Sequence, residues 1–196
     1  MTMTSMHDTK DRAWWYKYGE MGERYFVENI CPEINLDAKI NPEKERDPTV
    51  PDLVVNGQLS DLKTQKTPFF TAFRYHKMEN GIPVPYDPAY TVTFNYKDCK
   101  RYNKLYPDID IYFWVNWKDT SYSSSFGTMV QVTPVSGVWV VNFDQLKTLI
   151  EEKQYHLHAY GKRVGRAGNA RDSYLIDLRD LRRLGTRTWN TLYNLN

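Results

Sequence analysis

Cysteine is scarce in this sequence, and long apolar runs are missing. Its 196 residues include two cysteines, Cys31 and Cys99, and neither has a Cys or His nearby at zinc-finger spacing. The sequence therefore encodes neither a disulfide framework nor a structural zinc site. The longest strictly apolar run, 111–115, is too short to span a bilayer, and residues 1–11 are polar, unlike a signal peptide. We expect a soluble cytoplasmic protein that does not enter a membrane.

The motifs of several enzyme classes are also absent. The sequence has no glycine-rich loop for phosphates, no nucleophile elbow around a serine and no dinucleotide-binding fingerprint. Its four histidines have no spacing typical of a metal cluster or of the base that activates a nucleophile. The chemistry of this chain must therefore be sought in its carboxylates and cations.

Charge is nearly balanced overall but unevenly distributed. The net charge is +2, yet residues 161–196 contain eight Lys and Arg against three Asp, which gives +5 there and leaves −3 for residues 1–160. Solvated loop charge is one interpretation of this basic tail. The other is contact with a nucleic-acid backbone, which suits the cations of its Gly- and Ala-rich stretch: Lys162, Arg163, Arg166 and Arg171.

Apolar periodicity and turn residues predict one α/β domain over residues 1–196, a length that a single core can support. The expected helices are 8–30, ended by Pro32, then 97–106 and 143–153. The expected strands are 36–40, 50–55, 59–65, 90–96, 109–117, 128–132 and 138–141, with Ser136-Gly137 as the turn between the last two. Residues 67–89 read as a Pro-rich aromatic insertion, residues 161–171 as a loop, and residues 173–184 as a short strand and an Arg-rich helix.

The clearest local signal is the pair Asn56-Gly57 between two strand-like runs, because this pair favours a two-residue type I′ turn. Counting outward from the turn places Asp52 directly opposite Asp61. Side chains at such positions have Cβ atoms about 4.5–5.5 Å apart, so the two carboxylates repel each other unless something compensates them. A divalent cation would do so.

The same face of this hairpin carries further polar groups. Side chains repeat every two residues along a strand, so Lys63 and Gln65 project beside Asp61. Magnesium prefers oxygen ligands, and two carboxylates with a backbone carbonyl, such as that of Leu62, can hold it against a phosphate. A nearby Lys can then orient water or neutralise charge that develops on the phosphate. The pattern is the one that a metal-dependent phosphodiesterase needs.

Pro51-Asp52, eight intervening residues and then Asp61-Leu62-Lys63 resemble the signature of the PD-(D/E)xK nuclease superfamily, which includes Holliday-junction resolvases, RecB-like exonucleases and many restriction endonucleases. The stretch 17–24, KYGEMGER, is similar to the first helix of that superfamily, where a Gly precedes a Glu-Arg pair. The resemblance covers residues 12–66 by motif, and residues 97–117 as a helix and strand of the same core.

The resemblance implies a restriction-endonuclease-like fold, in which helices flank a central mixed sheet, with an insertion near 67–89 and a basic C-terminal extension. It also implies hydrolysis of DNA phosphodiester bonds with Mg²⁺ or Mn²⁺, leaving a 5′-phosphate. The site residues would be the metal ligands Asp52, Asp61, Leu62 through its carbonyl, and Glu23, with Lys63 to position the attacking water and Gln65 to tune the site. Glu20 lies three residues from Glu23 on the same helical face and is the alternative ligand.

The triplet Asp/Glu-x-Lys carries little information alone, because 24 acids and 14 lysines predict roughly two matches by chance. The sequence contains five. Only 61–63 lies on a predicted strand behind an upstream Pro-Asp and a hairpin that pairs two acids. Context, rather than the triplet, therefore carries the resemblance.

DNA is the expected partner, in recombination or repair. Endonuclease and exonuclease activity both remain open, and so does the oligomeric state, because exonucleases of this superfamily ring DNA as oligomers whereas resolvases cut as dimers. One alternative is an inactive nucleic-acid-binding protein of the same fold within a larger DNA-processing complex. Another is a hairpin that holds a structural cation without a role in nucleic-acid chemistry.

Overall fold

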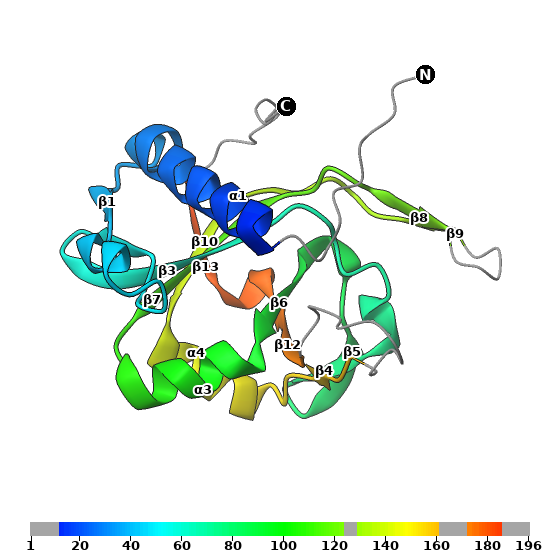
Figure 1. The fold of residues 1–196 in the computed structure, drawn as a ribbon. Helices are drawn as coiled ribbons and strands as arrows, with labels where there is room; N and C mark the ends of the chain where they lie inside the picture. Colours follow the sequence, from blue (N-terminus) through cyan, green and yellow to red (C-terminus); the bar gives the residue numbers. More distant parts are fainter. Residues whose placement is uncertain (1–11, 124–128, 161–171, 186–196) are drawn as a thin grey trace, which may run out of the picture.

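The computed structural model is built around a six-stranded mixed sheet with the strand order β1-β2-β3-β7-β10-β13 (Figure 1). The structure describes residues 12–123, 129–160 and 172–185, with residues 12–18 described by their backbone alone. The strands of this sheet are β1 (Ala38–Ile40), β2 (Leu53–Val55), β3 (Gln58–Gln65), β7 (Asp110–Asn116), β10 (Ser136–Asn142) and β13 (Arg182–Leu184). The three helices of ten or more residues in the described part of the chain are α1 (Arg12–Tyr25), α3 (Tyr96–Leu105) and α4 (Phe143–Glu152). Among the strands that the structure describes, only β3 and β7 pair in parallel. The predicted α/β class with a central mixed sheet is confirmed.

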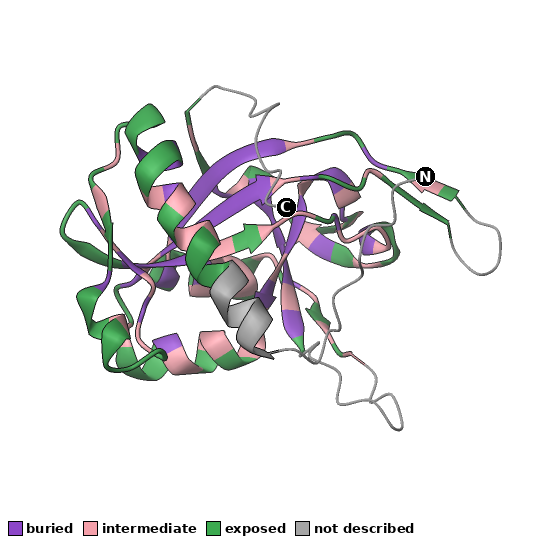
Figure 2. Ribbon diagram, turned by 45° about the horizontal axis from the view of Figure 1, so that its top comes forward, coloured by how far each residue is buried: buried purple, intermediate pink, exposed green. Residues whose placement is uncertain are grey.

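Each face of this sheet packs against its own apolar core. Tyr112 and Trp114 of β7 face the core under α1, whereas Ile111 and Phe113 face the core that includes residues of α3 and α4. Figures 1 and 2 show α1 over one face, α3 and α4 on the other, and buried residues concentrated in the strands between them. Burial on both faces explains why β7 has the continuous apolar sequence of an interior strand.

The first helix ends at Glu33, one residue beyond Pro32. This helix consists of three consecutive parts: α1, a π-helical turn at Phe26–Ile30, and the short α2 (Cys31–Glu33). In the π-helical turn, the Cys31 N–H donates to the Phe26 carbonyl, five residues back. Proline lacks an N–H and crowds the preceding turn, so a widened turn before it is a physically reasonable accommodation. The helix predicted over 8–30 is confirmed from Arg12 onward.

The β2–β3 hairpin has the predicted turn and register. Asn56 and Gly57 have φ values of 50° and 81°, and a type I′ turn requires both to be positive. Leu53 pairs with Ser60, as counted from the turn. Beyond this pair, the next residues along the two strands are the two acids.

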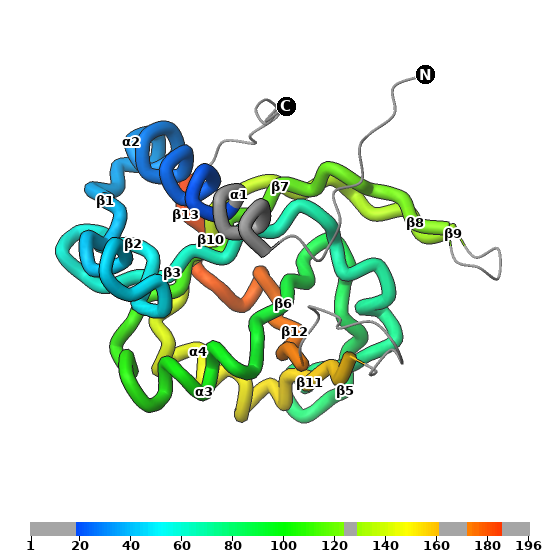
Figure 3. The backbone as a smooth tube through the Cα atoms, in the orientation of Figure 1, coloured from blue at the N-terminus to red at the C-terminus, as the bar shows by residue number. Residues whose placement is uncertain are grey.

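The hairpin predicted around Ser136-Gly137 is wrong. These residues begin β10, which pairs along its whole length with β7 and on its other side with β13. The ribbon of β8 (Ser121–Ser123) and β9 (Met129–Gln131) connects β7 to β10 and extends away from the two cores (Figures 1 and 3). Gly137 provides space rather than a turn, because a Cβ there would lie 2.9 Å from ring atoms of Trp139.

The Arg-rich helix predicted before residue 184 is also wrong. The strand before it is confirmed as β12 (Ser173–Asp177), but only a short 3₁₀ turn follows, and Arg183 then lies on β13 at the edge of the central sheet. Its guanidinium donates to the Ser136 carbonyl at 3.1 Å and lies over the Trp139 ring. Residues 172–185 therefore belong to the sheets rather than to an extension, because β10 pairs with β13 along its second edge.

A second sheet, in the order β11-β12-β6, lies on the α3 and α4 side of the central sheet (Figure 1). The strand predicted at 90–96 is confirmed as β6 (Thr91–Asn95), and it pairs with β12 and not with the central sheet. The short strand β11 (Leu157–His158) completes it. Because α3 begins directly after β6, this second sheet determines where α3 lies.

The 67–89 segment contains a hairpin that the sequence reading missed. Its strands are β4 (His76–Glu79) and β5 (Ile82–Pro85), joined by Asn80 and Gly81 with φ values of 52° and 79°. The turn therefore has the same residue pair as the β2–β3 hairpin.

None of the helices in the described residues combines the length and apolar character that a membrane span requires.

We expect Gly137→Ala to lower the free energy of unfolding by about 1–3 kcal/mol, because the added methyl overpacks the Trp139 ring. Gly22→Ala is the matched control: nothing lies within 4 Å of its ideal Cβ, and alanine in a helix interior is favoured by up to about 1 kcal/mol. Urea denaturation measures both. Equal stability of Gly137→Ala and the wild type would contradict the placement of β10 between β7 and β13.

Candidate active site

Asp52 lies immediately before β2 and is fixed by a buried asparagine. The Asn41 N–H donates to the Asp52 carbonyl, and the Asn41 side chain donates to the Pro51 carbonyl, each at 2.9 Å. The Leu62 N–H donates to Asp52 Oδ2 at 3.3 Å. The Asp52 carboxylate is therefore held beside β3, close enough to Asp61 for its charge to affect the Asp61 pKa.

Asp61 is a buried carboxylate, with 2% of its surface exposed. Its pKa is raised from 3.8 to about 6: burial raises it most, the Lys63 ammonium lowers it, and the Asp52 charge adds to the rise. Its Oδ2 atom lies 2.8 Å from Lys63 Nζ but makes no hydrogen bond of good geometry. A buried polar atom without such a bond is rare in folded proteins and calls for an explanation.

Lys63 joins β3 to α3. Its Nζ atom lies 2.8 Å from Asp61 Oδ2 and 2.7 Å from Asp98 Oδ2, with the Tyr102 ring centroid 5.8 Å away. Burial by itself lowers the pKa of Lys63, but the Asp61, Tyr102 and Asp98 groups together raise it well above its ordinary value. Lys63 therefore stays protonated at neutral pH and acts as a hydrogen-bond donor and a positive charge, not as a base.

Glu23 reaches the same region from α1. Lys44 Nζ lies 2.6 Å from Glu23 Oε2 and 2.7 Å from Asp52 Oδ1, so one ammonium joins the two acids. Burial raises the Glu23 pKa, Lys44 lowers it, and the Asp61 charge raises it, which shows that Glu23 also feels Asp61. Glu20, the alternative ligand, is exposed.

Gln65 has a structural partner. Its side-chain amide donates to the Thr93 carbonyl at 2.8 Å and accepts from the Thr93 N–H at 3.1 Å, so both ends of the amide bind the backbone of β6. This pair ties β6, and with it the start of α3, to the end of β3. Gln65 thereby helps to hold Asp98 over Lys63, and a tuning role in a reaction stays a prediction.

Together these residues form two acid–lysine–acid triplets that meet where Asp52 faces Asp61. We call them the hairpin site; its members are Glu23, Lys44 and Asp52 in one triplet, and Asp61, Lys63 and Asp98 in the other. All six side chains are 3–21% exposed, so solvent screens their charges only in part. Four carboxylates thus face two ammonium groups in a half-buried setting.

The donors around Asp61 suit a hard cation. The Leu62 N–H points to Asp52, and because the N–H and C=O of a strand residue point to the same side, its carbonyl faces that side too. Two carboxylates and a carbonyl are ligands that Mg²⁺ or Mn²⁺ accepts, and the Asp61 Oδ2 atom, which lies 2.8 Å from Lys63 Nζ, is an oxygen of this kind. The residues present therefore fit such an ion.

In this structure two carboxylates, and not three, are placed to bind the ion. In the described part of the chain, no group of three or more Asp, Glu, His or Cys side chains is arranged to hold a metal ion as it stands. The Lys44 ammonium contacts both Glu23 and Asp52, so these two carboxylates already share a cation that the chain supplies. Glu23 is therefore a neighbour of the donor set rather than a member of it in this structure.

The sequence reading missed four residues around the hairpin site: Lys44, Asp98, Arg101 and Tyr102. Lys44 lies in a polar turn with no motif, and Asp98 belongs to a rejected Asp-x-Lys triplet that opens α3. Arg101 donates to the Thr49 carbonyl at 3.0 Å and so links α3 to the segment before Asp52. No local signal identifies them, because their positions depend on how the turn at Pro42–Glu45 and helix α3 pack against the hairpin.

The predicted nucleic-acid contacts Lys162, Arg163, Arg166 and Arg171 lie outside the described residues. A cavity of about 730 Å³ lies elsewhere, between α4 and the β10–β13 edge, and is lined in part by Asp110, Asp144 and Asp180. None of its lining residues belongs to the hairpin site. The candidate site is therefore the cluster of charges around the start of β2 and the middle of β3, and not this cavity.

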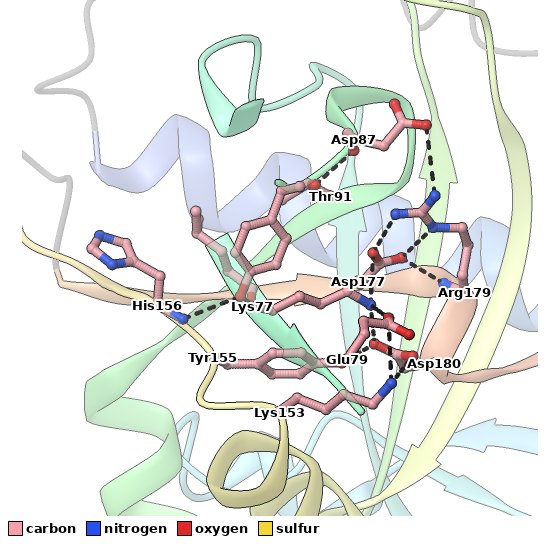
Figure 4. A network of polar contacts seen from close by, with 12 residues as sticks. Lys77, Glu79, Asp87, Thr91, Lys153, Tyr155, His156, Asp177, Arg179 and Asp180 are labelled. Atoms are coloured by element: carbon pink, nitrogen blue, oxygen red, sulfur yellow. Dashed lines mark hydrogen bonds and ion pairs between the residues drawn. The ribbon is translucent and has the colours of Figure 1, made fainter. Parts of the chain in front are cut away.

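A second cluster of ion pairs lies at the 67–89 segment (Figure 4). Lys77 is 2% exposed, and its ammonium lies 3.0 Å from the fully buried Asp177 and 2.6 Å from Asp180. Asp180 also receives bonds from Lys153 and from the Tyr155 hydroxyl. Asp177 and Asp180 both receive hydrogen bonds from cationic side chains. This cluster joins β4, the end of α4 and β12, which is a structural role.

Comparison with models of known protein families, with curated proteins and with solved structures finds no match. The resemblance to the PD-(D/E)xK superfamily therefore depends on the residues of this chain and on where the fold places them.

We expect Asp61→Asn to raise the free energy of unfolding at pH 7 by about 1–3 kcal/mol. Because the Asp61 pKa is raised from 3.8 to about 6, the native state binds the proton more tightly than the unfolded chain does. The charge on Asp61 therefore removes stability as the pH rises through that window, and the whole penalty is present above it. Asparagine keeps the shape without the charge.

Urea unfolding at pH 7.5 and near pH 4 tests this expectation. The gain should be present at the higher pH and nearly vanish at the lower one. Asp37→Asn is the control, since Asp37 is an exposed acid of another Asp-x-Lys triplet and should leave stability unchanged. If Asp61→Asn destabilises the protein at pH 7.5, the carboxylate stabilises the fold as a partner of Lys63, and its charge does not lower stability.

Proposed function

We propose that the protein is a Mg²⁺- or Mn²⁺-dependent deoxyribonuclease with a restriction-endonuclease-like fold of the PD-(D/E)xK type. The observation that carries this proposal is the Asp61 carboxylate. It is buried, its pKa is raised although Lys63 Nζ lies 2.8 Å from its Oδ2 atom, and the charge of Asp52 contributes to that rise. A fold keeps such an arrangement against its own stability when the arrangement has a chemical use.

The topology supports the proposal. The acids and Lys63 lie on the β2–β3 hairpin, and β3 is followed, after β6 and α3, by the parallel strand β7. A hairpin, a crossover helix and a parallel strand, with α1 on the opposite face, form the arrangement that the resemblance implies. The insertion at 67–89 and the small sheet would then be additions to this core.

Each residue of the hairpin site has a role in this proposal. Asp52, Asp61 and the Leu62 carbonyl hold the ion, which when bound would supply positive charge to the phosphate and make a water molecule more acidic. Lys63, held by Asp98, donates to the attacking water or to the phosphate oxygen on which charge grows. Glu23 lies next to the ion and can hold a water molecule. The substrate is the DNA backbone.

An inactive DNA-binding protein of the same fold remains the second candidate, and the charge placement argues against it. In a protein that only binds DNA, the neighbouring acids Asp52 and Asp61 would weaken binding, because carboxylates repel phosphates. A purely structural cation is the third. It predicts that metal raises stability while DNA is neither bound nor cut.

Cleavage of supercoiled plasmid and of a labelled branched duplex, with Mg²⁺, Mn²⁺ or EDTA, tests the activity. We expect cutting that needs the metal and falls at least about 100-fold in Lys63→Ala, because the charge on the developing phosphorane is no longer neutralised. Nicking of the plasmid would indicate an endonuclease, and trimming of ends an exonuclease.

Lys39→Ala is the control for this experiment. Lys39 belongs to the triplet Asp37-Ala38-Lys39 on β1 and is exposed, so its loss should leave cutting intact. Salt-sensitive DNA binding without cutting by the wild type would instead favour the inactive binding protein. Cutting that persists in Lys63→Ala would remove the hairpin site from the reaction.

A further inference from the structure

Lys44 occupies the place between two acids that a cation would take. Its ammonium lies 2.6 Å from Glu23 Oε2 and 2.7 Å from Asp52 Oδ1, and these acids come from α1 and from the segment before β2. Burial lowers the Lys44 pKa, while Asp52 and Glu23 raise it to above its ordinary value, so the ammonium stays charged. Lys44 is thus a cation that the chain itself supplies.

The fold directs Lys44 to this place. It lies in a 3₁₀ turn, Pro42–Glu45, that is capped by the Asn41 side chain, which accepts from the Glu43 N–H at 3.1 Å. The same Asn41 binds the backbone of Pro51 and Asp52, and only 2% of Asn41 is exposed. The start of the Lys44 stem is therefore fixed relative to Asp52.

Only the tip of Lys44 is free to leave. Glu45 after it is exposed, and the Lys44 side chain is itself 15% exposed, so a rotation of its four-carbon stem can bring the ammonium into water. Lysine is suited to this, because its ammonium is strongly hydrated and its stem is flexible.

Lys44 and a divalent ion at Asp52 exclude each other on electrostatic grounds. Lys44 Nζ is in contact with Asp52 Oδ1, so an ion bound through the same carboxylate would place two positive centres within a few ångströms. At that separation and partial burial, like charges repel by several kcal/mol at an effective dielectric of about 20. When Lys44 leaves, Glu23 is released as well and can turn toward the ion.

We propose that Lys44 is a displaceable internal counter-ion, which holds Glu23 and Asp52 in the metal-free protein and must leave their carboxylates before Mg²⁺ or Mn²⁺ binds at Asp52 and Asp61. The inference rests on the proposed function, because it concerns the same ion. Lys44 then sets the metal concentration at which the site loads, and metal binding completes the acid cluster with Glu23.

Mn²⁺ titration of the DNA-free protein, followed by calorimetry or by electron paramagnetic resonance of the unbound ion, tests this role without any cleavage assay. We expect Lys44→Met to bind Mn²⁺ at least about tenfold more tightly than the wild type, because no ammonium has to be displaced. Lys104→Met removes the same charge from an exposed position on α3 and should change the affinity by less than about twofold at moderate salt.

Lys44→Gln is a second variant in case Lys44→Met does not fold, since it removes the charge but keeps a hydrogen-bond donor for one carboxylate. It should also bind Mn²⁺ more tightly than the wild type. In the absence of metal, both Lys44 variants should unfold at a lower temperature than the wild type, and Mn²⁺ should raise their midpoint more than it raises that of the wild type.

The outcomes separate the two proposals. Wild-type binding that Asp61→Asn abolishes, with equal or weaker binding by the Lys44 variants, would overturn the role of Lys44 and leave the metal site intact. Absence of Mn²⁺ binding in the wild type and in every variant would overturn both. Tighter binding by Lys44→Met alongside unchanged Lys104→Met supports both.

Discussion

The constraint on which the rest of the structure depends is the register of the β2–β3 hairpin, which places two carboxylates opposite each other at a partly buried sheet edge. The Asn56-Gly57 turn fixes that register, and the Asn41 bonds to Pro51 and Asp52 hold the segment that leads into β2, beyond the last ladder pair. Two acids so placed need positive charge nearby. The surrounding elements each supply part of it.

The charges come from elements that are far apart in the sequence. The 3₁₀ turn before β2 supplies Lys44, β3 supplies Lys63, and α3 supplies the acid Asp98 that orients Lys63. Gln65 contributes by fixing β6, from which α3 starts. Even so, the Asp61 Oδ2 atom is left without a good hydrogen bond, and the Asp61 pKa remains raised although an ammonium lies beside it. The chain balances the charges of this site only in part, which supports the proposal that it binds a cation.

Local signals in the sequence predict some elements of this fold correctly and others wrongly. The Asn56-Gly57 turn and the apolar strand β7 are determined by residues within a few positions, so their prediction from sequence succeeds. Ser136-Gly137 looks like a turn but is a space for the Trp139 ring, which only the packing of β10 reveals.

Pairing between strands that are far apart in the sequence explains the other differences between the predicted and the observed elements. The arginines after Asp180 look helical by composition, yet they form β13 because β10 pairs with them on its second edge. In the site, the sequence places Asp52, Asp61 and Lys63 together through the hairpin alone. It cannot place Lys44, Asp98 or Arg101, whose positions depend on how a turn and a helix pack against that hairpin.

The central claim is that Asp52 and Asp61 form a cation site. The most direct test is the anomalous diffraction signal of crystals grown with Mn²⁺. The account predicts a peak bounded by the Asp52 and Asp61 carboxylates and the Leu62 carbonyl, with the Lys44 ammonium turned away from Asp52. Crystals in which Lys44 still joins Glu23 to Asp52, with no peak at Asp61 at saturating Mn²⁺, would contradict it.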